Sequence, residues 1–189
     1  MHWLKEALSA AAIMVWLAGD AQTGAAQAEE GKKVECSDTN LQFDAPGFTV
    51  KCKDYSQASL SVGEVNAATK TYSLFAVSET DLTFLNVFSN HVLGGTRLYY
   101  DRRSLESDLE DHFHAKFSDW ASEDDAGGYE VKRVTVALKN DEPMECVAFR
   151  KLGARRQQGV SGMTVGFACS GNGRQHAVDA MKRFVGETD

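Results

Sequence analysis

The chain has 189 residues, a formal net charge of −7 and 43% hydrophobic residues. A chain of this length and composition can bury a core of its own as a single domain. Its acidic charge disfavours nucleic acid and anionic lipid surfaces because like charges repel, so we expect neither as a partner.

The first residues have the three-part layout of a secretory signal peptide. A head that carries Lys5 precedes an apolar run over 7–19, and small residues then lead to Ala26-Gln27-Ala28, a cleavage site of the A-x-A type. A transmembrane helix needs ~20 apolar residues, so the run is too short for a retained membrane anchor. We therefore predict a signal peptide over 1–28, an exported domain over 29–189, and a periplasmic or secreted location.

Alternating apolar and polar residues predict strands in the first half of the domain. Phe48, Val50 and Cys52 have the period of a half-buried strand, and the turn residues 44–47 before them indicate a hairpin over about 41–53. Further strands are expected over 60–62 and 72–77, with a break over 66–70 between them.

The next two segments give weaker signals. Leu82 and Leu85 fit a helix face, whereas an alternating strand over 81–92 fits poorly, so the state of this segment stays open. A short strand is expected over 97–101.

The clearest predicted helix covers residues 104–121. Ser104 suits the N-cap, and acidic residues in the first turn suit the helix dipole. Apolar residues recur every three or four positions and form one stripe, which we expect to be buried in the core. The stripe consists of Leu105, Leu109, Phe113, Phe117 and Trp120.

Three strands and a final helix are predicted in the last third of the chain. The strands cover 129–138, 145–151 and 163–169, and the helix covers 174–185 with Asn172 as its candidate cap. Strands grouped before and after a helix predict antiparallel pairing. We expect an α+β fold: one domain with a mainly antiparallel sheet of about five to seven strands, packed by two or three helices.

Four cysteines follow the predicted cleavage site: Cys36, Cys52, Cys146 and Cys169. An even number in an exported chain indicates disulfides, and the spacings are too long for a zinc site. We favour Cys36–Cys52 and Cys146–Cys169, because neighbours in the chain meet most easily.

The second of these disulfides tests the expected sheet. If Phe149 and Phe167 share a face, Cys146 and Cys169 lie on opposite faces of a regular antiparallel hairpin. A bulge at Gly166 would remove this conflict. Without one, Cys146 would pair with one of the two N-terminal cysteines.

Patterns for catalysis and metal binding are weak. The sequence 159–163 begins like the G-x-S-x-G nucleophile motif, but Met163 replaces the last glycine and a strand follows it. His112 and His114 would lie about 200° apart around a helix, so one metal ion could not bind both. The acidic residues near them indicate a solvated helix face. We assign no catalytic residue, no metal ligand and no cofactor.

Cations gather near the last two predicted strands. Arginine binds carboxylate or phosphate through two parallel hydrogen bonds. Binding residues lie in loops more often than in cores. Backbone N–H groups at the start of the last helix also favour an anion. We therefore predict partner or ligand binding by Arg150, Lys151, Arg155, Arg156 and Arg174. The alternative is that these cations serve solubility and protect a strand edge.

These features favour a small exported binding or accessory domain without catalytic activity, which docks to an envelope protein or binds a small, anionic ligand. The alternative is an exported hydrolase whose carboxylates and histidine meet only in the fold. A deep pocket with converging histidine and acidic groups would indicate the hydrolase. A shallow sheet face with an exposed apolar patch would indicate the binding domain.

Overall fold

The computed structural model describes residues 31–43, 45–56, 60–62, 65–67, 69–78, 80–93, 98–138 and 142–187. The predicted signal peptide over 1–28 lies outside these residues.

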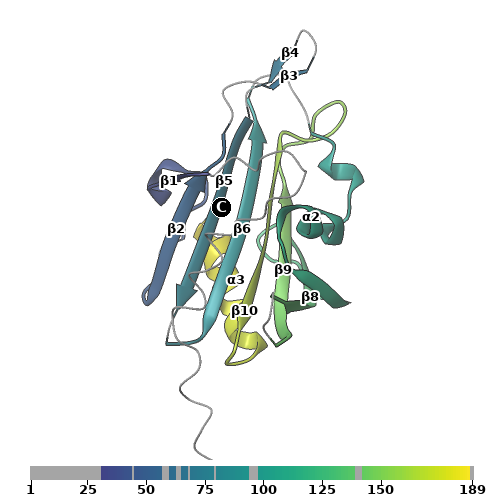
Figure 1. Cartoon of the computed structure of the whole chain (residues 1–189). Helices are drawn as coiled ribbons and strands as arrows, with labels where there is room; N and C mark the ends of the chain where they lie inside the picture. Colours follow the sequence, from purple (N-terminus) through teal and green to yellow (C-terminus); the bar gives the residue numbers. More distant parts are fainter. Residues whose placement is uncertain are drawn as a thin grey trace, which may run out of the picture.

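Eight antiparallel strands form one sheet in the order β1-β2-β5-β6-β10-β9-β8-β7 (Figure 1). The strands are β1 (Lys32–Val34), β2 (Phe48–Asp54), β5 (Thr69–Ser78), β6 (Thr83–Val92), β7 (Lys116–Ser122), β8 (Glu130–Ala137), β9 (Met144–Leu152) and β10 (Gly162–Ser170). A separate hairpin pairs β3 (Leu60–Val62) with β4 (Val65–Ala67). The antiparallel pairing confirms the prediction, and the sheet is larger than the five to seven strands expected.

The two faces of the sheet carry different helices. Helix α3 (Arg174–Glu187) packs against β6, β9 and β10, and the shorter α2 (Leu105–His112) contacts β7, β9 and β10. Figure 1 shows α2 in front of the sheet and α3 behind it. Two 3₁₀ helices, η2 (Cys36–Asp38) and η3 (Tyr100–Arg102), complete the helices of the described residues. The fold is thus a single β-rich domain.

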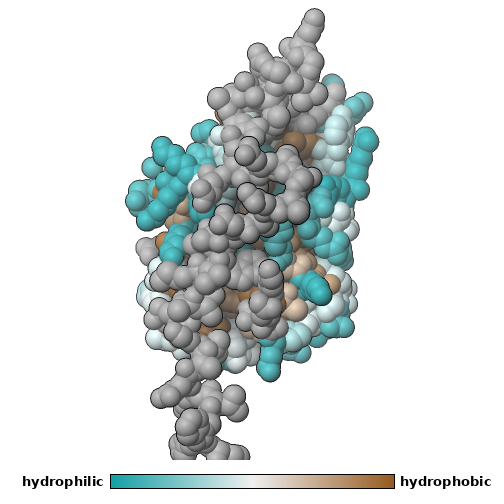
Figure 2. Space-filling model, viewed as in Figure 1, coloured by the Kyte–Doolittle hydropathy of each residue, from teal (hydrophilic) through white to brown (hydrophobic). Residues whose placement is uncertain are grey.

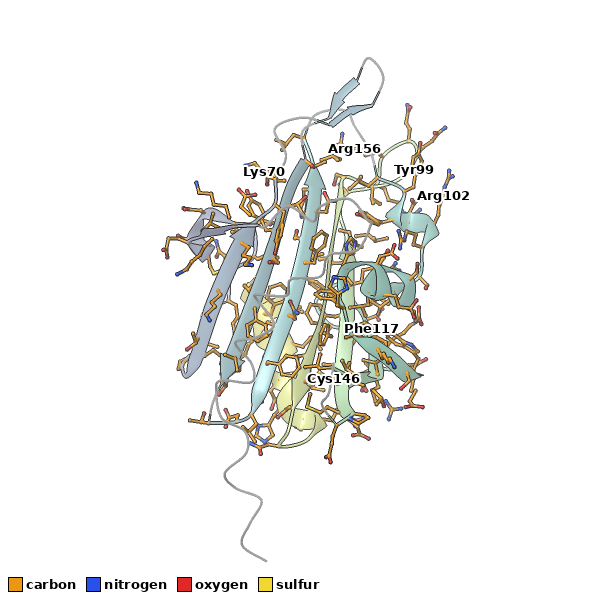
Figure 3. All side chains as sticks on the ribbon, viewed as in Figure 1. Lys70, Tyr99, Arg102, Phe117, Cys146 and Arg156 are labelled. Carbon is orange, nitrogen blue, oxygen red and sulfur yellow. A yellow bond between two sulfur atoms is a disulfide. The ribbon has the colours of Figure 1, made fainter. Side chains whose placement is uncertain are left out.

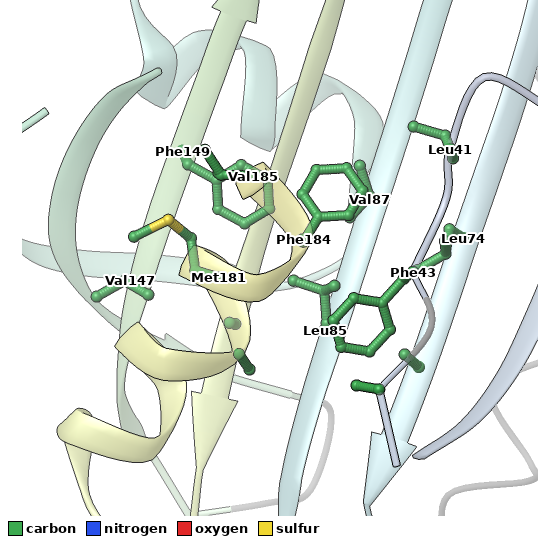
Figure 4. Packing of buried hydrophobic residues seen from close by; sticks show 14 of the residues in the cluster. Leu41, Phe43, Leu74, Leu85, Val87, Val147, Phe149, Met181, Phe184 and Val185 are labelled. Carbon is green, nitrogen blue, oxygen red and sulfur yellow. The ribbon is translucent and has the colours of Figure 1, made fainter. Parts of the chain in front are cut away.

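Each face has its own apolar core. The α3-face core joins the inner side of α3 to the sheet and to the segment before β2 (Figure 4). Its largest members include Leu41, Phe43, Leu74, Leu85, Phe149, Met181 and Phe184. The α2-face core is centred on Phe167, whose ring makes edge-to-face contacts with Phe84, Phe113 and Phe117.

Both predicted disulfides are present, Cys36–Cys52 and Cys146–Cys169. Cys146 lies directly opposite Cys169 in the β9–β10 register, which runs without a bulge at Gly166. The premise that Phe149 and Phe167 share a face was wrong: Phe149 belongs to the α3-face core and Phe167 to the α2-face core. Because both faces are covered, every residue of β10 is buried, and large apolar side chains point both ways.

The predicted helix over 104–121 was correct only in its first half. Ser104 caps α2 by accepting a hydrogen bond from the Ser107 N–H at 3.2 Å, but the helix ends at His112 and β7 follows. The register of β7 shifts between Ser118 and Ala121. This bulge keeps Phe117 and Trp120 on one face of a strand, although their spacing is that of a helix. The stripe does belong to the α2-face core.

Segment 81–92, left open by the sequence, forms strand β6. Leu85, Val87 and Ser89 are buried on the α3 face, whereas Phe84 and Phe88 pack into the α2-face core. Apolar residues therefore occupy both faces of β6, so its sequence lacks the alternation of apolar and polar residues that marks a half-buried strand.

Four smaller predictions were also wrong. The described residues of 41–53 form no hairpin with one another, because β2 pairs with β1 and β5 while Leu41 packs into the α3-face core. The expected strand near 97–101 is replaced by η3 and a single bridge at Leu98. Strand β5 begins at Thr69, inside the break that was expected over 66–70. The Asn172 amide donates to the Asp81 carbonyl at 2.9 Å instead of capping α3.

Candidate functional site

The five cations predicted from the sequence are not brought together in one site. Arg150 and Lys151 are neighbours on β9, so their side chains point to opposite faces of the sheet. Arg155 and Arg156 lie in the loop between β9 and β10, beyond the end of the sheet. Arg174 begins α3 at the other end of β10 and lies 3.8 Å from Glu123.

Arg150 belongs to a network of charges between α2 and the sheet. Its guanidinium lies 2.8 Å from one oxygen of Asp108 and 2.6 Å from Glu130. The other Asp108 oxygen lies 2.9 Å from Arg103, which also pairs with Asp111. Because Asp108 is fully buried, its charge depends on these partners. The geometry therefore gives Arg150 a role in holding α2 on the sheet.

Two carboxylates and a histidine, as the hydrolase alternative requires, do meet near this network. His112 stacks on Phe88 with ring centroids 4.1 Å apart, and burial lowers its pKa while Asp108 and Asp111 oppose that shift. Both Asp108 oxygens are, however, within 3 Å of a guanidinium nitrogen, at 2.9 and 2.8 Å. Such a carboxylate is occupied by its ion pairs, so the geometry favours a structural role for Asp108. The outer surface over α2 is mainly hydrophilic (Figure 2), as expected for a solvated face.

Four exposed cations gather at the end of the sheet where the β9–β10 loop lies, and we call them the basic end: Lys70, Arg102, Arg155 and Arg156. Figure 3 shows Lys70, Arg102 and Arg156 at this end, together with Tyr99. The Arg102 guanidinium lies 4.8 Å from the centre of the Tyr99 ring, and Tyr99 is 46% exposed. Among the described residues, no ion pair joins these four cations to an acidic side chain, although exposed Asp101 lies beside Arg102.

Hydrogen bonds hold the loop of the basic end. Val160 and Leu98 exchange two backbone hydrogen bonds, at 2.8 and 2.9 Å. The Arg156 N–H donates to the Gly159 carbonyl at 3.0 Å. Gly159 has a φ of +86°, and a Cβ there would lie 2.3 Å from the Leu98 carbonyl oxygen, so the turn requires glycine. Arg155 and Arg156 therefore extend from a closed turn.

Lys151 lines a cavity of about 260 Å³ on the α3 face, which we call the His91 cavity. Its lining residues are Asn40, Leu41, His91, Tyr129, Lys151, Leu152, Gly153 and Thr164. The Lys151 ammonium lies 5.1 Å from the centre of the Tyr129 ring. Burial lowers the pKa of His91, so its ring is neutral near pH 7.

Sequence reasoning missed His91, Asn40 and Thr164. Asn40 is 51 residues from His91 in the chain, and no motif links them. One signal was present: His91 follows Leu85, Val87 and Ser89 at a spacing of two, which places it on the α3 face once 83–92 is known to be a strand.

No protein-family model matches the chain, and no curated protein or solved structure matches it significantly. Within the described residues, no helix is long and apolar enough to cross a bilayer. In the same part of the chain, no group of three or more His, Cys, Asp or Glu residues is placed to hold a metal ion. The two disulfides are consistent with an oxidising compartment.

Proposed function

We propose that this protein is a non-catalytic binding domain of an oxidising compartment outside the cytoplasm. It docks through its basic end to an acidic surface of another envelope protein. The observation that carries the proposal is the gathering of exposed cations at one end of a chain with a net charge of −7.

The charge distribution supports docking in one orientation. The acidic remainder of the chain repels an acidic partner, whereas the basic end attracts it, and such a field orients the encounter. Arginine and tyrosine are common among the residues that dominate binding energy at interfaces. Tyr99 and Arg102 supply both, and Arg155 and Arg156 add two planar guanidinium groups that match carboxylates.

The closed turn of the β9–β10 loop also supports the proposal. A loop that is already ordered loses little conformational freedom when a partner binds. The hydrogen bonds between Val160 and Leu98 and the turn at Gly159 provide this order before any partner arrives.

The test is binding of the purified protein to a fluorescent poly-glutamate peptide at two salt concentrations. The wild type should bind, and its affinity should fall as salt rises. The Arg155→Ala/Arg156→Ala double variant should bind at least about tenfold more weakly, because two charge-assisted contacts are lost. Its free energy of unfolding should change by less than about 0.5 kcal/mol, since both side chains are exposed.

The matched control is Lys182→Ala/Arg183→Ala, which removes two exposed, adjacent cations from α3. It should bind the peptide like the wild type. Equal binding by the Arg155/Arg156 variant, or equal losses in both double variants, would contradict docking through the basic end.

A further inference from the structure

Helix α2 covers only part of its face of the sheet. It contacts β7, β9 and β10, and in Figure 1 it lies over that half of the sheet. Among the described residues, no α-helix lies in front of β2 and β5 in this view. We call the α2 side of β1, β2, β5 and the start of β6 the open face. Its strands place six side chains there that matter for binding: Lys33, Lys51, Lys53, Phe75, Val77 and Phe84.

An apolar patch occupies the middle of the open face. Phe84 packs against the α2-face core, and Val77 is its partner in the β5–β6 register. Phe75 lies two positions before Val77 on the same face, and its ring centroid is 6.3 Å from that of Phe84. Phe75 and Val77 are half-buried and belong to neither the α3-face core nor the α2-face core. The patch thus extends the apolar surface of the α2-face core beyond the strands that α2 covers.

Three lysines border this patch. Lys51 is the partner of Phe75 in the β2–β5 register, and Lys53 follows Lys51 on the same face. Lys33 is the partner of Lys53, and like charges placed directly opposite each other destabilise a sheet. Among the described residues, no ion pair joins these lysines to an acidic side chain, and the strands place no carboxylate on the open face. An acidic partner would remove this repulsion.

We propose that the open face binds an amphipathic helix of a partner protein. The apolar stripe of this helix lies on Phe75, Val77 and Phe84, and its acidic residues lie beside the lysines. The strands β2, β5 and β6 together span about 10 Å, since neighbouring strands lie ~4.8 Å apart, and one helix is about 10–12 Å wide. The partner helix therefore completes the layer that α2 begins. A second copy of this chain fits the open face poorly, because its lysines would face the same three lysines.

The test is titration of the purified protein with a fluorescent peptide of leucine and glutamate whose leucines form one helical stripe. The wild type should bind it saturably, with shifts in the NMR signals of the Phe75 ring. A peptide with lysine in place of glutamate should bind at least about tenfold more weakly, because its charge is repelled. A peptide of the original composition in shuffled order should also bind at least about tenfold more weakly, because it has no apolar stripe.

Two variants locate the binding. Lys51→Glu/Lys53→Glu should weaken it at least about tenfold, yet leave the protein at least as stable, because a carboxylate opposite Lys33 replaces a like charge. Phe75→Ser should also weaken it at least about tenfold, because apolar contact area is lost. The matched control Lys182→Glu/Arg183→Glu, on α3, should bind the peptide like the wild type. So should Arg155→Ala/Arg156→Ala, which separates the open face from the basic end.

Other occupants of the open face are measured in parallel. A dimer that Phe75→Ser abolishes would show that a second copy covers the face. Nuclear Overhauser contacts between the Phe75 ring and the apolar run over 7–19 would show that the chain covers the face itself. Binding to phosphatidylglycerol vesicles without binding to the peptide would show a lipid surface. Each of these results, equal binding of the shuffled peptide, or unchanged binding by Lys51→Glu/Lys53→Glu would overturn the proposal.

Discussion

The two faces of the sheet are covered in different ways. Helix α3 has 14 residues and lies on a continuous apolar core, with Ala177, Met181 and Phe184 buried against the strands. Helix α2 has eight residues, of which Leu105 and Leu109 are its buried apolar side chains. Such a short helix buries little apolar area, so its position depends on additional contacts.

Those contacts on the α2 face are ionic and aromatic. Asp108 is fully buried between Arg103 and Arg150, and the rings around Phe167 fill the space beside the helix. On the α3 face, in contrast, the buried polar groups are uncharged, as in the pair Ser89 and Thr164. The long helix α3 is held on the sheet by apolar contacts, and the polar groups of its face line the His91 cavity. The short helix α2 is held on the sheet in part by the ion pairs of its own polar groups.

The largest expected effect is on the free energy of unfolding, and it distinguishes the α3-face core from the α2-face core. Phe184→Ala should lower the free energy of unfolding by about 3–5 kcal/mol, because the side chain is fully buried in the α3-face core. Phe113→Ala should cost less, since Phe113 is only half-buried in the α2-face core. Urea denaturation of both variants measures the difference. A larger loss for Phe113→Ala would show that the α2 face contributes more to stability.

A second prediction concerns the attachment of α2. Arg150→Met should lower the free energy of unfolding by about 3 kcal/mol, because it leaves the buried Asp108 carboxylate with Arg103 as its remaining close cation. Adding Asp108→Asn should recover part of this loss, since the variant then buries no unpaired charge. Arg133→Met, at an exposed ion pair, is the control and should change stability by less than about 1 kcal/mol. Additive losses from Arg150→Met and Asp108→Asn would contradict the network.

The smallest expected effect is a pH dependence shared by both faces. Burial lowers the pKa of His91 on the α3 face and of His112 on the α2 face below 6.5. The unfolded chain therefore binds these protons first as the pH falls. Their contribution to stability is complete above about pH 6.5 and is lost as the pH falls toward the folded-state pKa.

Urea denaturation at pH 7.5 and pH 5.5 tests this dependence. His91→Gln and His112→Gln should each reduce the loss of stability between the two pH values, whereas His114→Gln, at an exposed histidine, should leave it unchanged. If neither buried histidine altered the slope, acid destabilisation would have to come from the carboxylates. Glu106 is the clearest of these: burial raises its pKa, but hydrogen bonds to Lys132, to the backbone and to Ser104, together with the charge of Lys132, outweigh burial and lower the pKa.

The sequence by itself determined several of the local elements and the presence of disulfides. The alternation over 48–52 and 72–77, the apolar face of the last helix and the even number of cysteines all predicted features that are present. These features follow from the periods of helix and strand and from the even number of cysteines, which need no knowledge of distant residues.

Only the tertiary structure decided how the two faces are covered and which polar groups meet. Phe117 and Trp120 have helical spacing, but a bulge and the ring of Phe167 place them on an edge strand. Phe149 and Phe167 point to opposite faces because the β9–β10 register places Phe149 opposite Gly166, the neighbour of Phe167, and no single-strand pattern records a register. The His91 cavity joins Asn40 to β6 across 51 residues, and the adjacent cations Arg150 and Lys151 separate because successive residues of a strand face opposite sides of a sheet.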